Sequence, residues 1–330
     1  MKVDRFLLWQ DGEYSYPLAM GFVPNLTSYI HDENTYNRPC MIVVPGGGYC
    51  IVTPTEGELV AKKFYEFGCN AFVLSYTTNL LTAEPLKEQP MKDLARAIRF
   101  VRSRAIEFHV RPNQLVICGF SAGGHLCGSV CVHHSDINDS KSEYAGISAR
   151  PNAAILGYPV ITSGEKAHTD SFRALLGDCP KTNELLYYSL EKQVSKDTPP
   201  CFLWQTATDE LVPVENSALF AIALKEQNIP FAYHVFSMGP HGMSLANDDW
   251  ANDRFGEPYT MEQTSRVMQA LREGTIQAPE DIKQMLLGFE SQDGTGFPPK
   301  QADAEVSAWP ELAWAWLQKT IKVCDYEQYH

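Results

Sequence analysis

The sequence predicts an α/β fold, in which helices cover both faces of a mainly parallel central sheet. Short apolar runs alternate along the chain with segments of helical periodicity, and several of the runs end at a glycine or proline turn. Runs that are apolar throughout indicate strands buried on both faces, as in parallel sheets. Such sheets place functional residues at the carboxyl ends of their strands, so those positions deserve the closest inspection.

Six apolar runs are expected to form the strands of this sheet: 40–44, 71–76, 115–118, 153–156, 201–206 and 231–236. Three segments between them have helical patterns, and these are 58–67, 91–107 and 214–227. Gly68 directly follows the first of these segments. It is expected to cap the helix, because glycine tolerates the left-handed backbone found at helix ends.

The region 247–304 interrupts this alternation. It contains two helical patterns, 261–273 and 278–287, and then a Gly/Pro-rich stretch, 288–300. A final helix is expected over 306–322, with its tryptophans packed against the sheet. We therefore expect a single domain over residues 1–330 with a helical insertion at 247–304. The insertion could be a lid, an oligomer contact or a wall of the substrate cleft.

Composition excludes several classes of partner. The formal net charge of −13, without basic blocks, argues against nucleic acid or an anionic membrane as the main partner. The apolar run near the N-terminus is too short for a signal peptide, and no later run is long enough to span a bilayer. The nine cysteines include no Cys-x-x-Cys pair, so neither a zinc nor a redox site is expected. Buried thiols favour the cytoplasm, although a chain that had lost a signal segment would look similar.

A serine flanked by glycines follows the strand expected at 115–118. Gly119-Phe120-Ser121-Ala122-Gly123 fits the pattern Gly-x-Ser-x-Gly and lies between that strand and a helix-compatible run. In a strand–turn–helix context this pattern is typical of a nucleophile held on a sharp turn, where larger residues at the glycine positions would clash. The sequence thus predicts Ser121 as a nucleophile at the positive end of a helix.

A serine nucleophile needs a base, and the base needs an orienting acid. In this fold the acid precedes the base along the chain. His241 follows the last predicted strand in a Gly-Pro-His-Gly loop and is the expected base, whereas His234 lies inside that strand, where packing explains it. Asp209 follows the strand that ends at residue 206 and is the expected acid, with Glu210 as the alternative.

Attack on a carbonyl creates a negatively charged oxygen that needs backbone N–H donors. Ala122, the residue after the nucleophile, is expected to supply one donor. The Pro-Gly-Gly-Gly-Tyr turn after the first strand can supply others, and Tyr49 and Cys50 beside it are expected to line the substrate pocket. His125 lies one helical turn beyond Ser121, and we expect a structural role for it.

The motifs VVPGGGY, GFSAGGH, TATDELVPVENS and GPHGMSLA together resemble the α/β-hydrolase superfamily over nearly the whole chain. They look most like the small esterase branch that contains acetyl-xylan and feruloyl esterases and related carbohydrate deacetylases. The resemblance implies a serine esterase with the catalytic residues Ser121, Asp209 and His241 and the oxyanion donors Gly47, Gly48 and Ala122. It also implies a short acyl group, such as acetyl on a sugar hydroxyl. Hormone-sensitive-lipase relatives carry histidine where this chain has Pro45 before the glycines.

The expected reaction is ester hydrolysis through an acyl-enzyme, with a small-molecule ester as partner and with no metal or organic cofactor. The sequence leaves open whether the chain forms a homo-oligomer. One alternative is a serine peptidase of the prolyl-oligopeptidase type, but such enzymes usually carry a large preceding domain. Another is a hydrolase fold that binds ligands without catalysis, but such proteins typically lack one catalytic residue, and all three candidates are present here.

Overall fold

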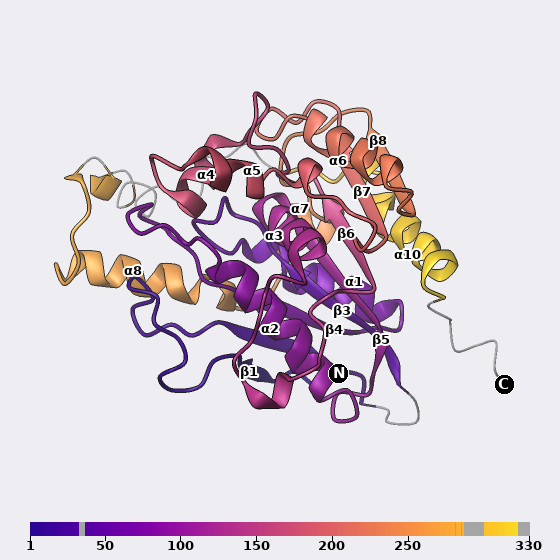
Figure 1. Ribbon diagram of the computed structural model, residues 1–330, viewed down its shortest axis with the longest axis horizontal. Coiled ribbons are helices and arrows are strands. Elements are labelled where there is room, and N and C mark those ends of the chain that lie inside the picture. Colours follow the sequence, from indigo (N-terminus) through magenta and orange to yellow (C-terminus); the bar gives the residue numbers. More distant parts are fainter. Residues whose placement is uncertain (33–36, 281, 285, 287–299, 323–330) are drawn as a thin grey trace.

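The computed structural model describes residues 1–32, 37–280, 282–284, 286 and 300–322. In this part of the chain, eight strands form one sheet in the order β1-β2-β4-β3-β5-β6-β7-β8 (Figure 1). The strands are β1 (Arg5–Leu7), β2 (Asn25–Tyr29), β3 (Arg38–Val44), β4 (Asn70–Ser75), β5 (Val110–Phe120), β6 (Ala153–Gly157), β7 (Cys201–Thr206) and β8 (Phe231–Phe236). The neighbouring pairs from β4 to β8 in this order are parallel, whereas the two pairs that include β2, with β1 and with β4, are antiparallel. The predicted mainly parallel sheet is confirmed.

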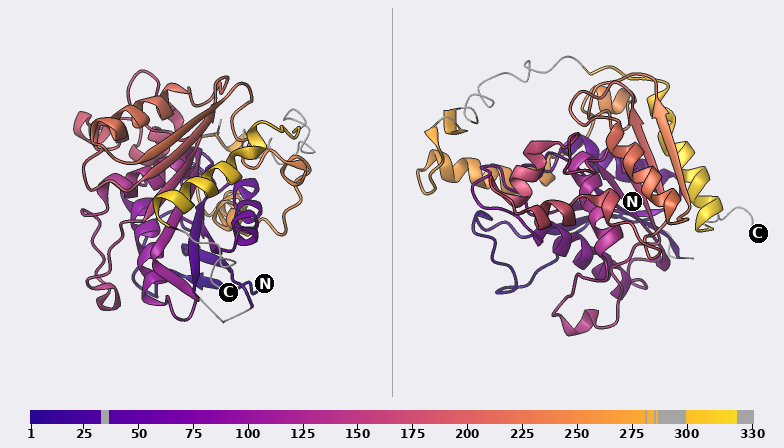
Figure 2. Two further views of the ribbon diagram at one scale, coloured as in Figure 1. Left: turned by 90° about the vertical axis from the view of Figure 1, so that its right-hand side faces the viewer. Right: turned by 45° about the horizontal axis from the view of Figure 1, so that its top comes forward.

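Helices cover both faces of this sheet (Figure 2). Those described are α1 (Glu58–Glu66), α2 (Gln89–Ser103), α3 (Ser121–His133), α4 (Thr169–Leu176), α5 (Thr182–Tyr187), α6 (Glu215–Glu226), α7 (Asp248–Ala251), α8 (Glu262–Arg272) and α10 (Trp309–Thr320). Side chains of α2, α3 and α6 pack into the core on one face, and those of α1 and α10 pack into the core on the other.

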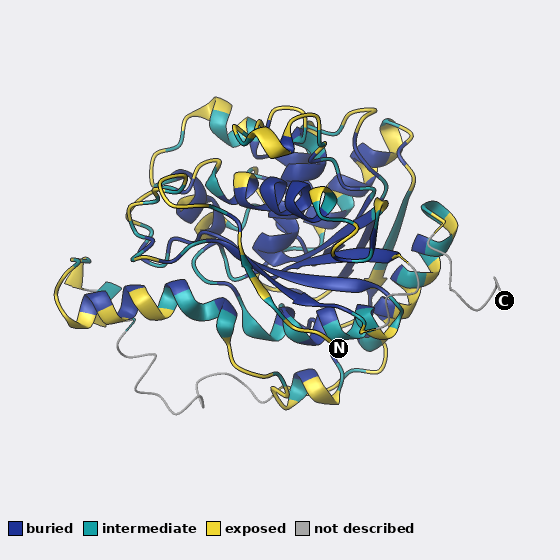
Figure 3. Cartoon of the chain, turned by 90° about the horizontal axis from the view of Figure 1, so that it is seen from below, coloured by how far each residue is buried: buried dark blue, intermediate teal, exposed yellow. Residues whose placement is uncertain are grey.

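The continuous apolar run in β3 fits this double burial. Met41 and Val43 face the core under α1 and α10, whereas Ile42 and Val44 face the core under α2 and α3. Successive strand residues point to opposite faces, so a strand covered on both sides needs apolar residues at every position. Figure 3 shows the result, with buried strands at the centre and exposed residues on the outer turns and helices.

Helix α2 differs from its predicted bounds of 91–107. It begins at Gln89, because Pro90 occupies a first-turn position where its missing N–H is not needed. It ends at Ser103, and the chain then turns back into β5 through His109, whose φ is 48°. This turn buries Phe108 in the core. The burial of one side chain therefore ends the helix before its apolar pattern does.

The structure adds elements that the sequence pattern did not predict: β1, β2, α4, α5 and α7. β2 has the sequence NLTSY, which lacks a run of apolar residues, and it is extended because it pairs with β4 in antiparallel register. Pairing with a neighbour thus decided its conformation, and its local composition did not.

The tryptophans of the last helix behave as predicted. Trp309 is fully buried and stacks on Trp204 of β7, with ring centroids 5.2 Å apart. Trp316 lies near Phe202 of the same strand, and Trp314 stacks on Phe67 after α1. The predicted segment 306–322 is a 3₁₀ turn, Val306–Ala308, followed by α10.

The insertion at 247–304 begins at the carboxyl edge of the sheet. The side chain of Gln263 in α8 hydrogen-bonds to both the N–H and the C=O of Thr78, just beyond β4. Leu81 packs against α8 in a small separate core, and the rest of α8 projects from the body (Figure 1). Of the predicted helix 278–287, residues 280, 282–284 and 286 are helical, whereas most of the Gly/Pro-rich stretch lies outside the described residues. The role of the insertion stays a prediction.

Six of the eight cysteines in the described ranges are buried, and all eight are free thiols. None of the described helices has the length and apolar character needed to cross a membrane.

Candidate active site

The turn between β5 and α3 holds Ser121 in a backbone conformation that few side chains adopt, with φ at 52°. The flanking glycines make this turn possible. A Cβ on Gly119 would lie 2.3 Å from the carbonyl oxygen of Gly123. A Cβ on Gly123 would lie 2.1 Å from the carbonyl oxygen of Val44 at the end of β3. The predicted clash is therefore present at both positions.

Replacing Gly123 with alanine is expected to lower the free energy of unfolding by about 3 kcal/mol, because the new methyl group meets rigid backbone. Urea unfolding followed by circular dichroism measures this loss. Gly164→Ala is the control, since Gly164 is exposed and its nearest neighbour is the Thr162 hydroxyl at 3.2 Å. Unfolding midpoints that agree between the two variants would contradict the steric argument.

The structure brings Ser121, His241 and Asp209 into one chain of hydrogen bonds. Nε2 of His241 lies 2.8 Å from Oγ of Ser121, and Nδ1 lies 2.7 Å from Oδ2 of Asp209. The other carboxylate oxygen of Asp209 accepts hydrogen bonds from the amides of Leu211 and Val212, at 3.0 and 2.9 Å. These amides fix the carboxylate, so that Oδ2 faces the imidazole. This arrangement can move a proton from the hydroxyl to the imidazole.

The alternatives that the sequence left open lie elsewhere. Glu210 is exposed, whereas the side chain of Asp209 is fully buried. His234 lies on β8, and its ring stacks on Phe202 with centroids 5.0 Å apart. Packing against the sheet accounts for His234, as predicted.

The glycine loop after β3 carries two of the predicted oxyanion donors. Gly47 and Gly48 have φ values of 119° and 64°, and a Cβ on Gly47 would lie 2.5 Å from the carbonyl oxygen of Ile51. Within the described residues, neither the Gly47 nor the Gly48 amide donates to a protein acceptor. Ala122 lies in the first turn of α3, where helix geometry leaves amides without a partner. Uncommitted amides are what a developing oxyanion requires, and their role stays a prediction.

Tyr49 does not lie where the sequence placed it. Its side chain is 1% exposed in the main core, and its hydroxyl lies 2.8 Å from Nδ1 of His125. This position corrects the expectation that Tyr49 lines the substrate pocket. Its side chain instead anchors the end of the glycine loop in the core beneath the site. Cys50 is partly exposed beside Gly48, where burial raises the pKa of its thiol to about 11. Its substrate contact stays a prediction.

His125 lies beneath the site, as its structural role predicts. Its Nε2 lies 2.9 Å from the carbonyl oxygen of Tyr188, so both ring nitrogens have partners. Burial lowers the pKa of His125 to about 4, and the ring is therefore neutral at physiological pH.

Three residues near the site were missed from the sequence. Tyr158 directly follows β6, and its ring lies 4.9 Å from that of His241. The strand-end rule could have found it. Glu56 hydrogen-bonds to Tyr158, but nothing in its local sequence predicts this contact. Burial first, and then the nearby His241, lower the pKa of His168.

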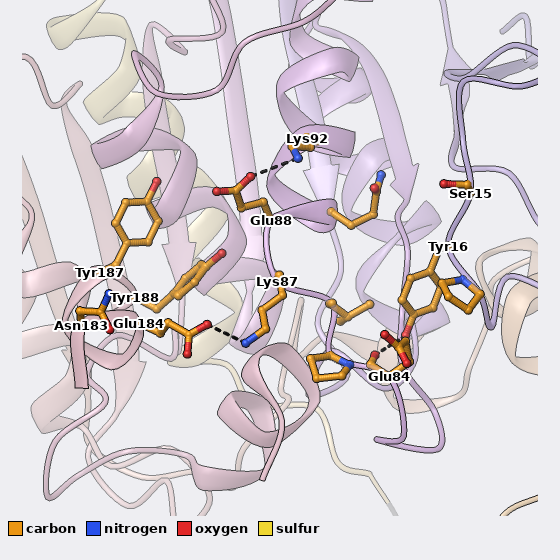
Figure 4. Close-up of a pocket in the computed structure, with 14 residues that line it drawn as sticks. Ser15, Tyr16, Glu84, Lys87, Glu88, Lys92, Asn183, Glu184, Tyr187 and Tyr188 are labelled. Carbon is orange, nitrogen blue, oxygen red and sulfur yellow. Dashed lines mark hydrogen bonds and ion pairs between the residues drawn. The ribbon is translucent and has the colours of Figure 1, made fainter. Parts of the chain in front are cut away.

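Two cavities help to locate the reaction. One, of about 840 Å³, is lined by the loop that carries His241 and by side chains that include Leu211, Trp250 and Lys300. Another, of about 690 Å³, lies between the loop at 84–89 and α5 (Figure 4). None of the predicted site residues lines this second cavity, in which Lys87 pairs with Glu184. Of these two cavities, only the first is lined by His241.

Residues 26–224 match the BD-FAE family of α/β hydrolases, and this match covers more than half of the chain. The chain belongs to the BD-FAE family. The branch predicted from the sequence motifs is thereby confirmed. The matched residues run from β2 to α6 and include the glycine loop, Ser121 and Asp209.

Individual relatives agree with this assignment to the BD-FAE family. Endo-1,4-beta-xylanase B of Butyrivibrio fibrisolvens is 53% identical over 264 residues, which is 80% of this chain and 41% of that protein. Acetylxylan esterase of Xylanibacter ruminicola is 32% identical over 219 residues, 64% of this chain and 42% of that protein. The chain thus spans about two fifths of the length of these curated relatives.

A solved structure is also similar. The acetyl ester-xyloside bifunctional hydrolase from Caldicellulosiruptor lactoaceticus has a TM-score of 0.69 and 37% sequence identity. The similarity covers 80% of this chain and 97% of that one. A solved protein therefore shares this fold over 80% of this chain.

Proposed function

We propose that this chain is a serine esterase that removes short acyl groups, acetyl above all, from sugar hydroxyls, with xylo-oligosaccharides as the substrate class. The observation that carries the proposal is the hydrogen-bonded series Ser121–His241–Asp209 at the carboxyl ends of β5, β7 and β8. Ser121, His241 and Asp209 act in this proposal as a catalytic triad.

The reaction has two halves. As Oγ of Ser121 attacks the ester carbonyl carbon, Nε2 of His241 takes the hydroxyl proton, and the carbonyl oxygen becomes an oxyanion. The amides of Gly47, Gly48 and Ala122 donate to this oxyanion. The ester C–O bond then breaks, and Nε2 returns the proton to the departing sugar oxygen, which leaves an acyl-enzyme.

Water completes the cycle. Nε2 takes a proton from the water as it attacks the acyl carbon, and a second oxyanion forms at the same amides. The bond to Oγ breaks and Oγ regains its proton, so the carboxylic acid leaves and the enzyme is restored. Asp209 accepts the hydrogen bond from Nδ1 of His241 and stabilises the imidazolium that forms in each half.

The substrate class is supported by the relatives' names. One relative is an acetylxylan esterase, another is a xylanase, and the similar solved structure is an acetyl ester-xyloside hydrolase. These names favour an esterase over the peptidase and the non-catalytic alternatives. The proposed partner is therefore a small-molecule ester. The cytoplasm is proposed from the cysteine content alone.

Two substrate panels test this proposal. Acetylated xylo-oligosaccharides are expected to release acetate, measured by an enzyme-coupled assay. p-Nitrophenyl esters are expected to show a kcat/KM that falls strongly from acetate to octanoate, because a small acyl pocket excludes long chains. Hydrolysis of peptidyl p-nitroanilides without ester hydrolysis would refute the proposal, and faster cleavage of octanoate would refute its acetyl preference.

A further inference from the structure

A buried carboxylate lies between the glycine loop and the strand end that carries Tyr158. Glu56 is 3% exposed, and its Oε2 accepts a hydrogen bond from the Gly46 amide at 2.6 Å. Its Oε1 accepts a hydrogen bond from the Tyr158 hydroxyl at 2.7 Å. Burial raises the pKa of Glu56, and the two hydrogen bonds oppose this rise. A carboxylate in such a place is costly unless its hydrogen bonds are made.

Tyr158 extends this contact to the loop of His241. Its ring packs edge-on against the imidazole, with centroids 4.9 Å apart at an interplanar angle of 71°. Its hydroxyl also accepts a hydrogen bond from the amide of Ser244, three residues after His241, at 3.1 Å. The Ser244 hydroxyl in turn donates to the carbonyl oxygen of Thr55, next to Glu56. Buried and partly buried hydrogen bonds thus connect the segment of Thr55 and Glu56, through Tyr158, to the loop that follows His241.

The backbone at these positions is strained. Ser121, Tyr158 and Ser244 have φ values of 52°, 35° and 33°, which side-chain-bearing residues rarely adopt. Such conformations persist only where surrounding contacts hold them in place. Glu56 lies close to the first of them too, because a Cβ on Gly46 would sit 2.8 Å from Cβ of Ser121 and 3.0 Å from Oε2 of Glu56.

We propose that Glu56 is a positioning residue for the reaction. Through Gly46 it sets the glycine loop that presents the oxyanion amides, and through Tyr158 it sets the ring against which His241 packs. One carboxylate therefore fixes the distance between the donors for the oxyanion and the base. Its two hydrogen bonds carry this role, and its charge does not. The inference rests on the proposed esterase function.

Two substitutions separate hydrogen bonding from charge. Glu56→Ala removes both acceptors, and kcat for p-nitrophenyl acetate is expected to fall roughly a hundredfold, as for a lost oxyanion donor, with KM little changed. Glu56→Gln keeps both links, because its amide oxygen can accept from Gly46 and its NH₂ can donate to the free lone pair of the Tyr158 hydroxyl. This variant is expected to stay within about fivefold of wild type. The burst of p-nitrophenol gives the concentration of functional sites. Dividing the rate by this concentration gives kcat per functional site, which unfolded protein does not affect.

A second variant and a control complete the design. Tyr158→Phe leaves the Ser244 amide without its acceptor while keeping the ring against His241, and we expect about a tenfold loss in kcat. Glu58→Ala is the matched control, since Glu58 also accepts from a glycine amide, that of Gly256 at 2.9 Å, but away from the site. Its kcat is expected to equal that of wild type.

The outcomes are distinct. A Glu56→Ala kcat per site within about threefold of wild type, or a loss confined to KM, would overturn the proposal. A Glu56→Gln loss as large as that of Glu56→Ala would also overturn it, because the charge would then be what matters. Absence of esterase activity in the wild type would instead be the failure of the proposed function itself.

Discussion

Ser121→Ala is expected to lower kcat for p-nitrophenyl acetate by roughly a millionfold, the size of loss seen when a serine hydrolase loses its nucleophile. Without Oγ no acyl-enzyme forms. The imidazole then has no hydroxyl proton to accept, and no oxyanion forms for the amides to stabilise. The fold is expected to remain, because alanine is smaller than serine and fits the same turn. Steady-state kinetics measure the loss, and circular dichroism verifies the fold.

Ser129→Ala is the matched control for this change. Ser129 lies on the same helix, α3, and its hydroxyl donates to the carbonyl oxygen of His125 at 2.8 Å. Losing that hydrogen bond is expected to lower the free energy of unfolding by about 1 kcal/mol. The substitution removes no catalytic group, so kcat is expected to stay unchanged. Equal ester hydrolysis by wild type and Ser121→Ala would show that the nucleophile lies elsewhere.

Asp209→Asn is expected to lower kcat about 10⁴-fold at neutral pH, with little change in KM. The amides of Leu211 and Val212 need an acceptor, so the asparagine carbonyl oxygen must take the place of Oδ1. Its NH₂ then faces Nδ1 of His241 and forces that nitrogen to accept. The imidazole proton moves to Nε2, which can no longer take the proton of Ser121.

Glu210→Gln tests whether Glu210, instead of Asp209, is the acid that orients His241. Glu210 is the neighbouring acid, it is exposed, and its replacement is expected to leave kcat for p-nitrophenyl acetate within about threefold of wild type. If Glu210→Gln lost activity while Asp209→Asn kept it, the roles of the two acids would be reversed. Stopped-flow release of p-nitrophenol distinguishes a slow acylation from a slow deacylation in each variant.

The parallel strands were the most predictable part of the fold. β7 and β8 have the predicted bounds, 201–206 and 231–236. Proline precedes both, and their turns follow directly, so local composition marks each end. The strands of the antiparallel pairs at one end of the sheet, β1 and β2, were not predicted, because their extended backbone comes from pairing with a distant segment.

Tyr49 shows the corresponding limit within the site. Its place after three glycines was evident, but the direction of its side chain was not. With φ at 64°, the backbone turns that side chain into the core toward His125, 76 positions away in sequence. A local pattern cannot reveal a direction that depends on a left-handed turn and a remote partner.

The sequence by itself determined the class of fold, the branch of hydrolases and the candidates Ser121, Asp209 and His241, because each lies in a glycine- or turn-rich motif at a strand end. Only the tertiary structure decided that the three side chains meet, that Asp209 and not Glu210 faces the imidazole, and that Glu56 joins the glycine loop to Tyr158. Hydrogen bonds between residues 102 and 120 positions apart depend on how the strands are ordered in the sheet. The order of the strands is a property of the whole packed chain, and no single segment encodes it.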